Sequence, residues 1–140
     1  MAARDSDPMQ VAVRALRHRD LSTAALDARL ERAGVDAESR QDALDELARV
    51  GYVDDGRFAA RRAHVLSDRG WGDAGIDADL RKQGLDADTR EAALAELEPE
   101  RNRARRIVDE RGPGQRTAAY LTRRGFGFDA VEQAVVAEEA

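Results

Sequence analysis

The sequence predicts an all-α protein, built as an elongated array of three tandem three-helix repeats. Aromatic residues make up only 4% of the 140 residues, whereas Ala, Leu, Arg, Asp and Glu dominate, and this composition favours helices over strands. A helix-stop signature, in which an apolar residue is followed four residues later by glycine and then by a second apolar residue, recurs along the chain. The spacing of these stops indicates the repeats.

The helix stops fix the end of each expected helix. Glycine takes the left-handed conformation at such ends, and the residue after it packs on the preceding turn. The signature is formed by Leu30/Gly34/Val35, Leu47/Gly51/Tyr52, Leu66/Gly70/Trp71, Leu80/Gly84/Leu85, Val108/Gly112/Pro113 and Leu121/Gly125/Phe126.

Two further helix ends lack glycine. Asp20 holds the glycine place between Leu16 and Leu21, and we expect it to be left-handed because Asp tolerates that conformation better than most residues. Pro99 follows Leu97 closely and cannot continue the preceding helix.

These stops repeat. Leu16, Leu30 and Leu47 are followed 50 residues later by equivalent stops, and a shorter third unit ends two helices at Val108 and Leu121. The segment GVDAESRQDALDEL from residue 34 also matches GLDADTREAALAEL from residue 84. The repeats are expected at about residues 9–50, 51–98 and 99–138, each holding three short helices that need their neighbours for stability.

Helix starts are marked by side chains that accept hydrogen bonds from the free N–H groups of the first turn. Asp36 and Asp86 are expected as N-caps of the third helices, and Ser22 and Asp73 as N-caps of the second. In the pair Asp54-Asp55, which opens the fourth helix, one Asp is expected to cap and the other to favour the helix dipole.

The motifs that could carry enzyme chemistry have structural explanations. No cysteine is present, and His18 and His64 stand in different units without acidic partners at metal-ligand spacing. Residues 70–75 match G-x-G-x-x-G, but the motif follows a helix, whereas dinucleotide binding needs a preceding strand. We expect no enzyme activity, no metal and no cofactor, and a cytoplasmic monomer with neither a signal peptide nor a membrane span.

The expected fourth helix carries basic side chains along one side. Arg57, Arg61 and His64 are spaced i, i+4, i+7, while the apolar side chains of this helix, Phe58, Val65 and Leu66, are expected to point to the core. A solvated surface and an interaction surface both explain the spacing. The net charge of −5 gives little basic footprint for phosphate binding, which favours a protein over nucleic acid as partner.

The segment Gly51-Tyr52-Val53-Asp54-Asp55-Gly56-Arg57-Phe58-Ala59 resembles the hallmark of the RecX family of recombinase regulators. The closing Leu121-x-x-Arg124-Gly125-Phe126 is also similar to that family, as are positions from Arg19 to Lys82. The resemblance covers residues 9 to about 137, so that the chain is interpreted as one RecX-like domain. On the second helix of the middle unit, where the family carries basic residues, this chain has Asp73, Asp77 and Asp79.

The resemblance implies three tandem three-helix repeats and binding in the groove of the RecA filament on single-stranded DNA. It also implies suppression of the ATPase, strand-exchange and repressor-cleavage activities of RecA, and so a role in DNA repair, recombination and the SOS response. The candidate partner-binding residues are Tyr52, Asp54, Asp55, Arg57, Arg61, Trp71, Lys82, Arg123 and Arg124. The alternative is a tandem helical DNA-binding regulator that acts without a recombinase.

Overall fold

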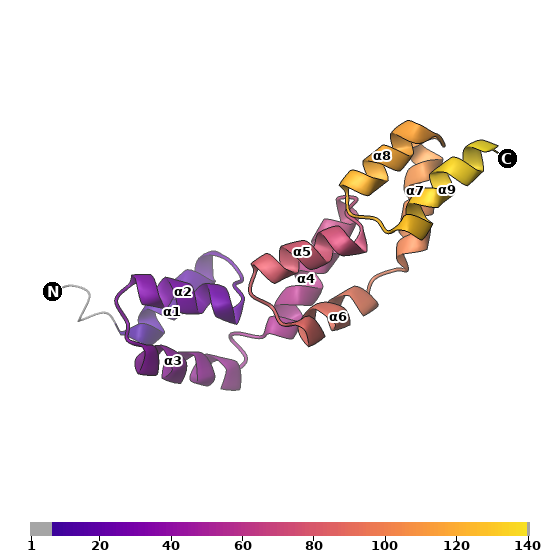
Figure 1. The fold of residues 1–140 in the computed structure, drawn as a ribbon. Coiled ribbons are helices and arrows are strands. Elements are labelled where there is room, and N and C mark those ends of the chain that lie inside the picture. Colours follow the sequence, from indigo (N-terminus) through magenta and orange to yellow (C-terminus); the bar gives the residue numbers. More distant parts are fainter. Residues whose placement is uncertain (1–6, 140) are drawn as a thin grey trace.

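The computed structural model describes residues 7–139, and within that range it contains nine helices and no strand. They follow one another along an elongated molecule whose described ends lie far apart (Figure 1). The helices are α1 (Pro8–His18), α2 (Thr23–Arg32), α3 (Ala37–Arg49), α4 (Asp55–Asp68), α5 (Asp73–Lys82), α6 (Ala87–Ala95), α7 (Glu100–Arg111), α8 (Gln115–Arg123) and α9 (Phe128–Glu139).

Three separate apolar cores divide the helices into groups of three. Leu26, Leu30 and Leu47 belong to the first core, which α1, α2 and α3 enclose. The second core lies among α4, α5 and α6, and the third among α7, α8 and α9. Helices pack extensively only within a group, so the fold is the predicted array of three-helix units. The boundaries after residues 50 and 98 stay a prediction.

Five of the glycine stops are confirmed. Gly34, Gly51, Gly70, Gly84 and Gly125 all have φ between +80° and +91°. After each of them, the next backbone N–H donates to the carbonyl five residues earlier, which closes the turn at 2.9–3.3 Å. This conformation costs an L-residue about 1–2 kcal/mol, which is why the sequence uses glycine there.

Two other predicted stops differ. Gly112 has φ +85°, but its own N–H closes the end of α7 on the carbonyl of Val108 at 2.8 Å, because Pro113 has no N–H to donate. The expectation for Asp20 was wrong: no residue other than glycine has positive φ within residues 7–139. Helix α1 ends at His18, and Arg19 continues in an extended conformation.

Three of the expected caps form as predicted. The side chains of Ser22, Asp54 and Asp86 each accept the backbone N–H three residues later, at 2.8–3.1 Å. They open α2, α4 and α6 respectively.

The other two expected caps depart from the prediction. Asp36 holds the N-cap position of α3 but makes no side-chain hydrogen bond. Asp73 is the first residue of α5 rather than its cap, a position held by Gly72. The carboxylate of Glu100 on α7 accepts a hydrogen bond from the Asp73 N–H at 2.9 Å. A side chain of the third unit therefore caps the start of α5 in the second.

An arginine clamp recurs in the first two units. Arg40 on α3 donates to Asp27 of α2 at 2.9 Å and to a backbone carbonyl in the α2–α3 turn at 2.9 Å. Fifty residues later, Arg90 on α6 makes the same two bonds, to Asp77 of α5 and to the α5–α6 turn, both at 2.8 Å. The repeat therefore preserves polar contacts as well as the core.

The second helices of the three units lie end to end. At one joint, Ser22 at the start of α2 donates its hydroxyl to the carbonyl of Gln83 at the end of α5 (2.7 Å). At the other, the N–H of Gly72 at the start of α5 donates to the carbonyl of Arg124 at the end of α8 (2.8 Å). We call this line of α8, α5 and α2 the helix row. The carboxyl end of each helix meets the amino end of the next, so their dipoles align.

The G-x-G-x-x-G segment builds the second joint. Gly70 ends α4, whereas Gly72 and Gly75 allow the turn around Gly125 to approach the start of α5. A Cβ on Gly72 would lie 2.5 Å from the backbone nitrogen of Phe126. The amino end of α5 therefore binds the backbone carbonyls of the turn that follows α8, in the way that a nucleotide-binding helix binds phosphate.

Candidate functional site

An exposed cation stands at the same position near the end of each helix of the row. Arg32 on α2, Lys82 on α5 and Arg123 on α8 all lie in the last helical turn, where a cation favours the helix dipole. They occupy equivalent repeat positions. We call the outer side of the helix row, marked by these three residues, the basic face.

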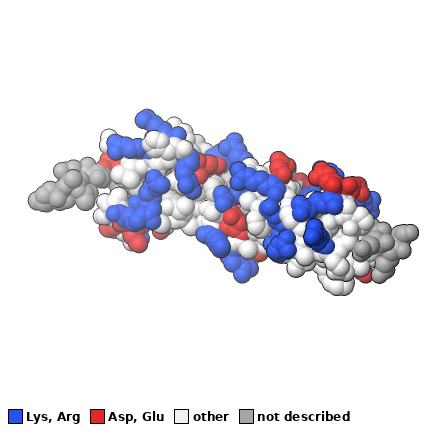
Figure 2. All heavy atoms as spheres, turned by 90° about the horizontal axis from the view of Figure 1, so that it is seen from above, with Lys and Arg blue, Asp and Glu red and all other residues white. Residues whose placement is uncertain are grey.

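Seen from above the view of Figure 1, Lys and Arg side chains extend along the length of the molecule with fewer acids among them (Figure 2). The third helices α3 and α6 lie on the opposite side in Figure 1 and expose Glu38, Asp42, Asp88 and Glu91. The chain, with a net charge of −5, thus carries its charges asymmetrically.

The three aspartates of α5 do not oppose the basic face, because each is paired within the protein. Asp73 pairs with Arg103 of α7, and Asp79 pairs with Arg62 of α4. Asp77 accepts from Arg90 at 2.8 Å. The hydrogen bonds that Arg62 donates to the Asp79 carboxylate raise the pKa of the Arg62 guanidinium above its ordinary value. The acidic appearance of this helix in the sequence therefore overstates its surface charge.

The predicted arginines of α4 have different surroundings. Arg57 is half-buried and donates to the carbonyl of Gly51 at 3.1 Å, so that it partly serves the α3–α4 connection. Arg61 is 70% exposed, and its guanidinium lies 3.8 Å from the carboxylate of Asp20. An exposed ion pair of this length contributes little to stability in water. Val65, expected in the core, is instead 46% exposed, because α4 turns this side toward the first unit rather than its own core.

The predicted residues around the α3–α4 connection are partly structural. Tyr52 is 60% exposed, whereas Asp54 caps its own helix. Asp55 accepts the N–H of Thr23 at 2.8 Å, and so caps α2 of the first unit from the second. The pair Asp54-Asp55 therefore serves two helix starts, one on each side of the joint.

Trp71 and Arg124 meet at the second joint. The Arg124 guanidinium lies 4.7 Å from the Trp71 ring centre and 5.1 Å from that of Tyr120, whose ring also has Arg111 at 3.8 Å. The four side chains alternate cation and aromatic ring, an arrangement that stabilises the joint. Arg123, next to Arg124, points to solvent on the basic face.

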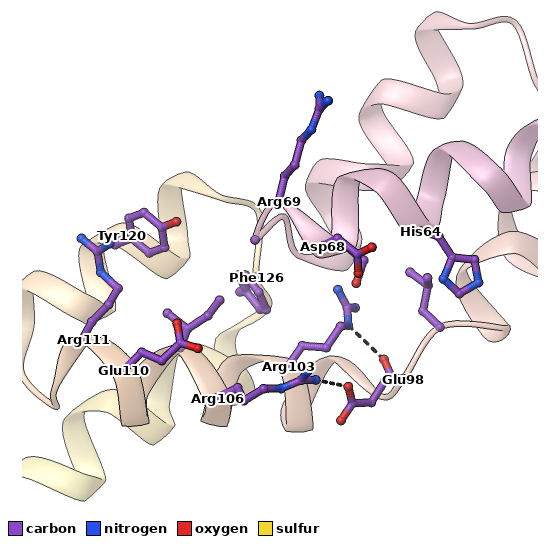
Figure 3. Close-up of a pocket in the computed structure, with 14 residues that line it drawn as sticks. His64, Asp68, Arg69, Glu98, Arg103, Arg106, Glu110, Arg111, Tyr120 and Phe126 are labelled. Atoms are coloured by element: carbon purple, nitrogen blue, oxygen red, sulfur yellow. Dashed lines mark hydrogen bonds and ion pairs between the residues drawn. The ribbon is translucent and has the colours of Figure 1, made fainter.

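A groove of about 470 Å³ runs from the end of α4 to α7 and α8 (Figure 3). Arg103 and Arg106 both bind Glu98 within it, Arg103 through the backbone carbonyl and Arg106 through the carboxylate. Arg69 extends away from the groove, while Arg111 lies against Tyr120. Since its arginines are largely occupied, this groove presents little free charge.

Sequence reasoning missed the roles of Arg103 and Glu100. Arg103 is 6% exposed and bridges the second and third units. Its guanidinium donates to the carboxylate of Asp73 and to the backbone carbonyl of Trp71, the latter at 3.0 Å. Glu100 accepts the N–H of Gly127 at 3.1 Å in addition to that of Asp73. Neither role has a signal within the repeat, because both depend on how two units meet.

No group of three or more potential metal-ligating side chains occurs in the described part of the chain. None of its helices has both the length and the hydropathy to cross a membrane.

The second unit matches the family model described as RecX, second three-helix domain, over residues 54–94. Regulatory protein RecX of Trichlorobacter lovleyi is 31% identical over 143 aligned positions, which cover 91% of this chain and 93% of the relative. Regulatory protein RecX of Stenotrophomonas maltophilia is also 31% identical, over 94% of this chain and 86% of the relative.

Two solved structures share the fold. The crystal structure of RecX from Lactobacillus salivarius superposes with a TM-score of 0.81, at 15% identity, over 96% of both chains. A second crystal structure of regulatory protein RecX has a TM-score of 0.77 at 18% identity, and covers 91% of this chain and 70% of that one.

Proposed function

The chain belongs to the RecX family, a family of regulatory proteins rather than enzymes, and from this premise we propose that it binds the RecA filament on single-stranded DNA. Binding lowers the ATPase, strand-exchange and coprotease activities of the filament. The resemblance and the family name support RecA as the partner. The basic face is the surface that we propose for binding it.

The observation that carries the proposal is the equivalent position of Arg32, Lys82 and Arg123 on the helix row. Between the cations, the exposed positions Ala28, Ala78 and Ala119 have short side chains. Short side chains on this face let the surface of a partner protein approach closely. Carboxylates of the partner can then form ion pairs with the regularly spaced cations. Charge of complementary sign also accelerates the encounter.

Direct binding to nucleic acid is the competing function. The three repeat-equivalent cations of this face neutralise few phosphates, and each neutralised phosphate contributes a slope of only about 0.9 to the dependence of log affinity on log salt. We therefore expect weak binding to naked DNA, with RecA required for tight association.

The test is steady-state ATP turnover by RecA on single-stranded DNA, titrated with this chain. The wild-type chain is expected to lower turnover at near-stoichiometric or substoichiometric ratios. Lys82→Glu and Arg123→Glu should each require about tenfold more protein for the same effect, because a charge reversed on a binding face typically costs more than 1 kcal/mol.

Arg49→Glu is the matched control. Arg49 is exposed on α3, away from the basic face, and makes a local ion pair with Glu46. It should inhibit like the wild type. Unchanged RecA turnover at all ratios, together with tight and salt-steep binding to DNA alone, would establish the DNA-binding alternative instead.

A further inference from the structure

A second groove, of about 440 Å³, lies at the joint of the first and second units and is strongly basic. We call it the basic groove. Four arginines line it against one acid: Arg19, Arg61, Arg62 and Arg69, with Asp20. In a chain with a net charge of −5, this is a local excess of positive charge.

Only part of that charge is satisfied internally. Arg62 is held by Asp79, and Arg61 lies 3.8 Å from Asp20. Within residues 7–139, neither Arg19 nor Arg69 forms an ion pair, and both are exposed. Two guanidinium groups therefore remain available to an incoming carboxylate.

The rest of the lining is apolar. Phe58, Val65 and Leu66 all belong to α4, and their side chains line the groove beside the arginines. Val65 is 46% exposed although its spacing from Phe58 predicts a core position, and Leu66 is half-buried. Removing such surface from water stabilises a complex by about 25 cal/mol for each Å² buried.

We propose that the basic groove binds an acidic peptide segment that carries an apolar side chain between its carboxylates. The inference rests on the proposed function, because it gives the chemistry of the segment that the partner protein supplies. Arg19 and Arg69 pair with carboxylates, for which the planar guanidinium is suited. Val65 and Leu66 receive the apolar side chain.

The lining favours a peptide over a nucleic-acid strand. Strand binding without sequence preference combines cations with exposed aromatic rings on which bases stack. Phe58 is the only aromatic side chain in the lining and is only 7% exposed, so that it offers no stacking surface. Aliphatic lining beside guanidinium groups matches a peptide with mixed acidic and apolar residues.

The groove of Figure 3 provides an internal comparison. It also has four arginines, but three acids accompany them, and Arg103 and Arg106 are already bound to Glu98. It lacks the charge excess that would select an acidic segment. The proposal therefore concerns the basic groove alone.

The experiment measures fluorescence anisotropy of a short labelled peptide of glutamates interrupted by leucine and phenylalanine, with the full chain and no RecA or DNA. We expect saturable binding, weakened on the order of tenfold by Arg19→Glu or Arg69→Glu. Val65→Ser should weaken it on the order of fivefold, because apolar contact is lost.

Two matched controls are available at the carboxyl end of α3. Arg49→Glu reverses an exposed charge elsewhere, and Val50→Ser removes a valine that is also 46% exposed but lies outside the groove. Both should bind the peptide like the wild type. A second peptide, in which serine replaces leucine and phenylalanine, should bind on the order of fivefold more weakly.

Three results would overturn the inference. Equal binding of the serine peptide would show that the apolar lining plays no part. Displacement of the peptide by oligo(dT), with the same dependence on Arg19 and Arg69, would make the groove a nucleic-acid site. Absence of peptide binding by a chain that still lowers RecA turnover would refute the groove while leaving the proposed function intact.

Discussion

The glycine contact between α5 and α8 makes a quantitative prediction about Gly125→Ala. Gly125 has φ +82°, and an added Cβ would lie 2.6 Å from the Cα of Gly75. Gly51 has nearly the same φ, +85°, but an added Cβ there would have no atom within 4 Å. The two substitutions share the backbone strain, and only one of them forces the joint apart.

The structure gives the expected magnitudes. Gly51→Ala should lower the free energy of unfolding by about 1–2 kcal/mol, the cost of a left-handed L-residue. Gly125→Ala adds a collision with backbone that has no flexible end to move. Relief of the collision breaks the bonds from Gly72 N–H and Ala74 N–H to the carbonyls of Arg124 and Gly125, now 2.8 and 3.0 Å long. Each is worth about 0.5–1.5 kcal/mol, so Gly125→Ala should cost about 2–5 kcal/mol.

Urea unfolding, followed by circular dichroism and by the fluorescence of Trp71, measures both variants. Trp71 is the only tryptophan and lies at the joint, so its emission should change in Gly125→Ala and not in Gly51→Ala. Equal free energies of unfolding for the two variants would refute the close backbone contact. Gly72→Ala tests it without φ strain, since Gly72 has φ −86°.

Four further predictions concern the caps and the buried arginine. Ser22→Ala should cost about 1–2 kcal/mol in urea unfolding, because one hydroxyl both caps α2 and binds the carbonyl of Gln83; a smaller loss than for an ordinary surface serine would contradict this. Asp86→Ala should destabilise the chain more than Asp36→Ala, since only Asp86 forms a side-chain cap. The hydrogen bond from the Thr89 N–H lowers the Asp86 pKa. The cap therefore stabilises the folded chain at neutral pH, and this stabilisation is lost as the pH falls below the ordinary carboxyl pKa. The free energy of unfolding of Asp86→Ala should not show this part of the decrease in acid. Arg103→Met should cost about 3 kcal/mol, because it removes the hydrogen bonds of a buried guanidinium to the carbonyls of Glu98 and Trp71, each worth about 1.5–3 kcal/mol, and a neutral result in thermal unfolding would exclude the bridge.

Features that depend on a few neighbouring residues could be predicted from the sequence. The left-handed glycines and the caps by Ser22 and Asp86 follow from local backbone requirements, and the 50-residue offset identified the repeat. Asp20 failed because a left-handed stop is only one of several ways to end a helix, and here α1 ends earlier in extended backbone.

Features at the joints could not be predicted from the sequence in the same way. Val65 has a core-like spacing, yet α4 exposes it, and Arg103 looks like one of many surface arginines, yet it is buried. Asp73 resembles a cap by position, but it pairs with Arg103 while Glu100 serves its N–H. Each outcome depends on the placement of one unit against the next, which no periodicity within a unit records.

The proposed binding of the RecA filament to the basic face is tested most directly by site-specific labelling. The chain has no cysteine, so Ala78→Cys on α5 and Ala92→Cys on α6 place a single fluorophore on the basic face and on the opposite side. Addition of RecA filaments on single-stranded DNA should change the emission of the label at position 78 and leave the label at position 92 unchanged. A response at position 92 with none at position 78 would contradict the account.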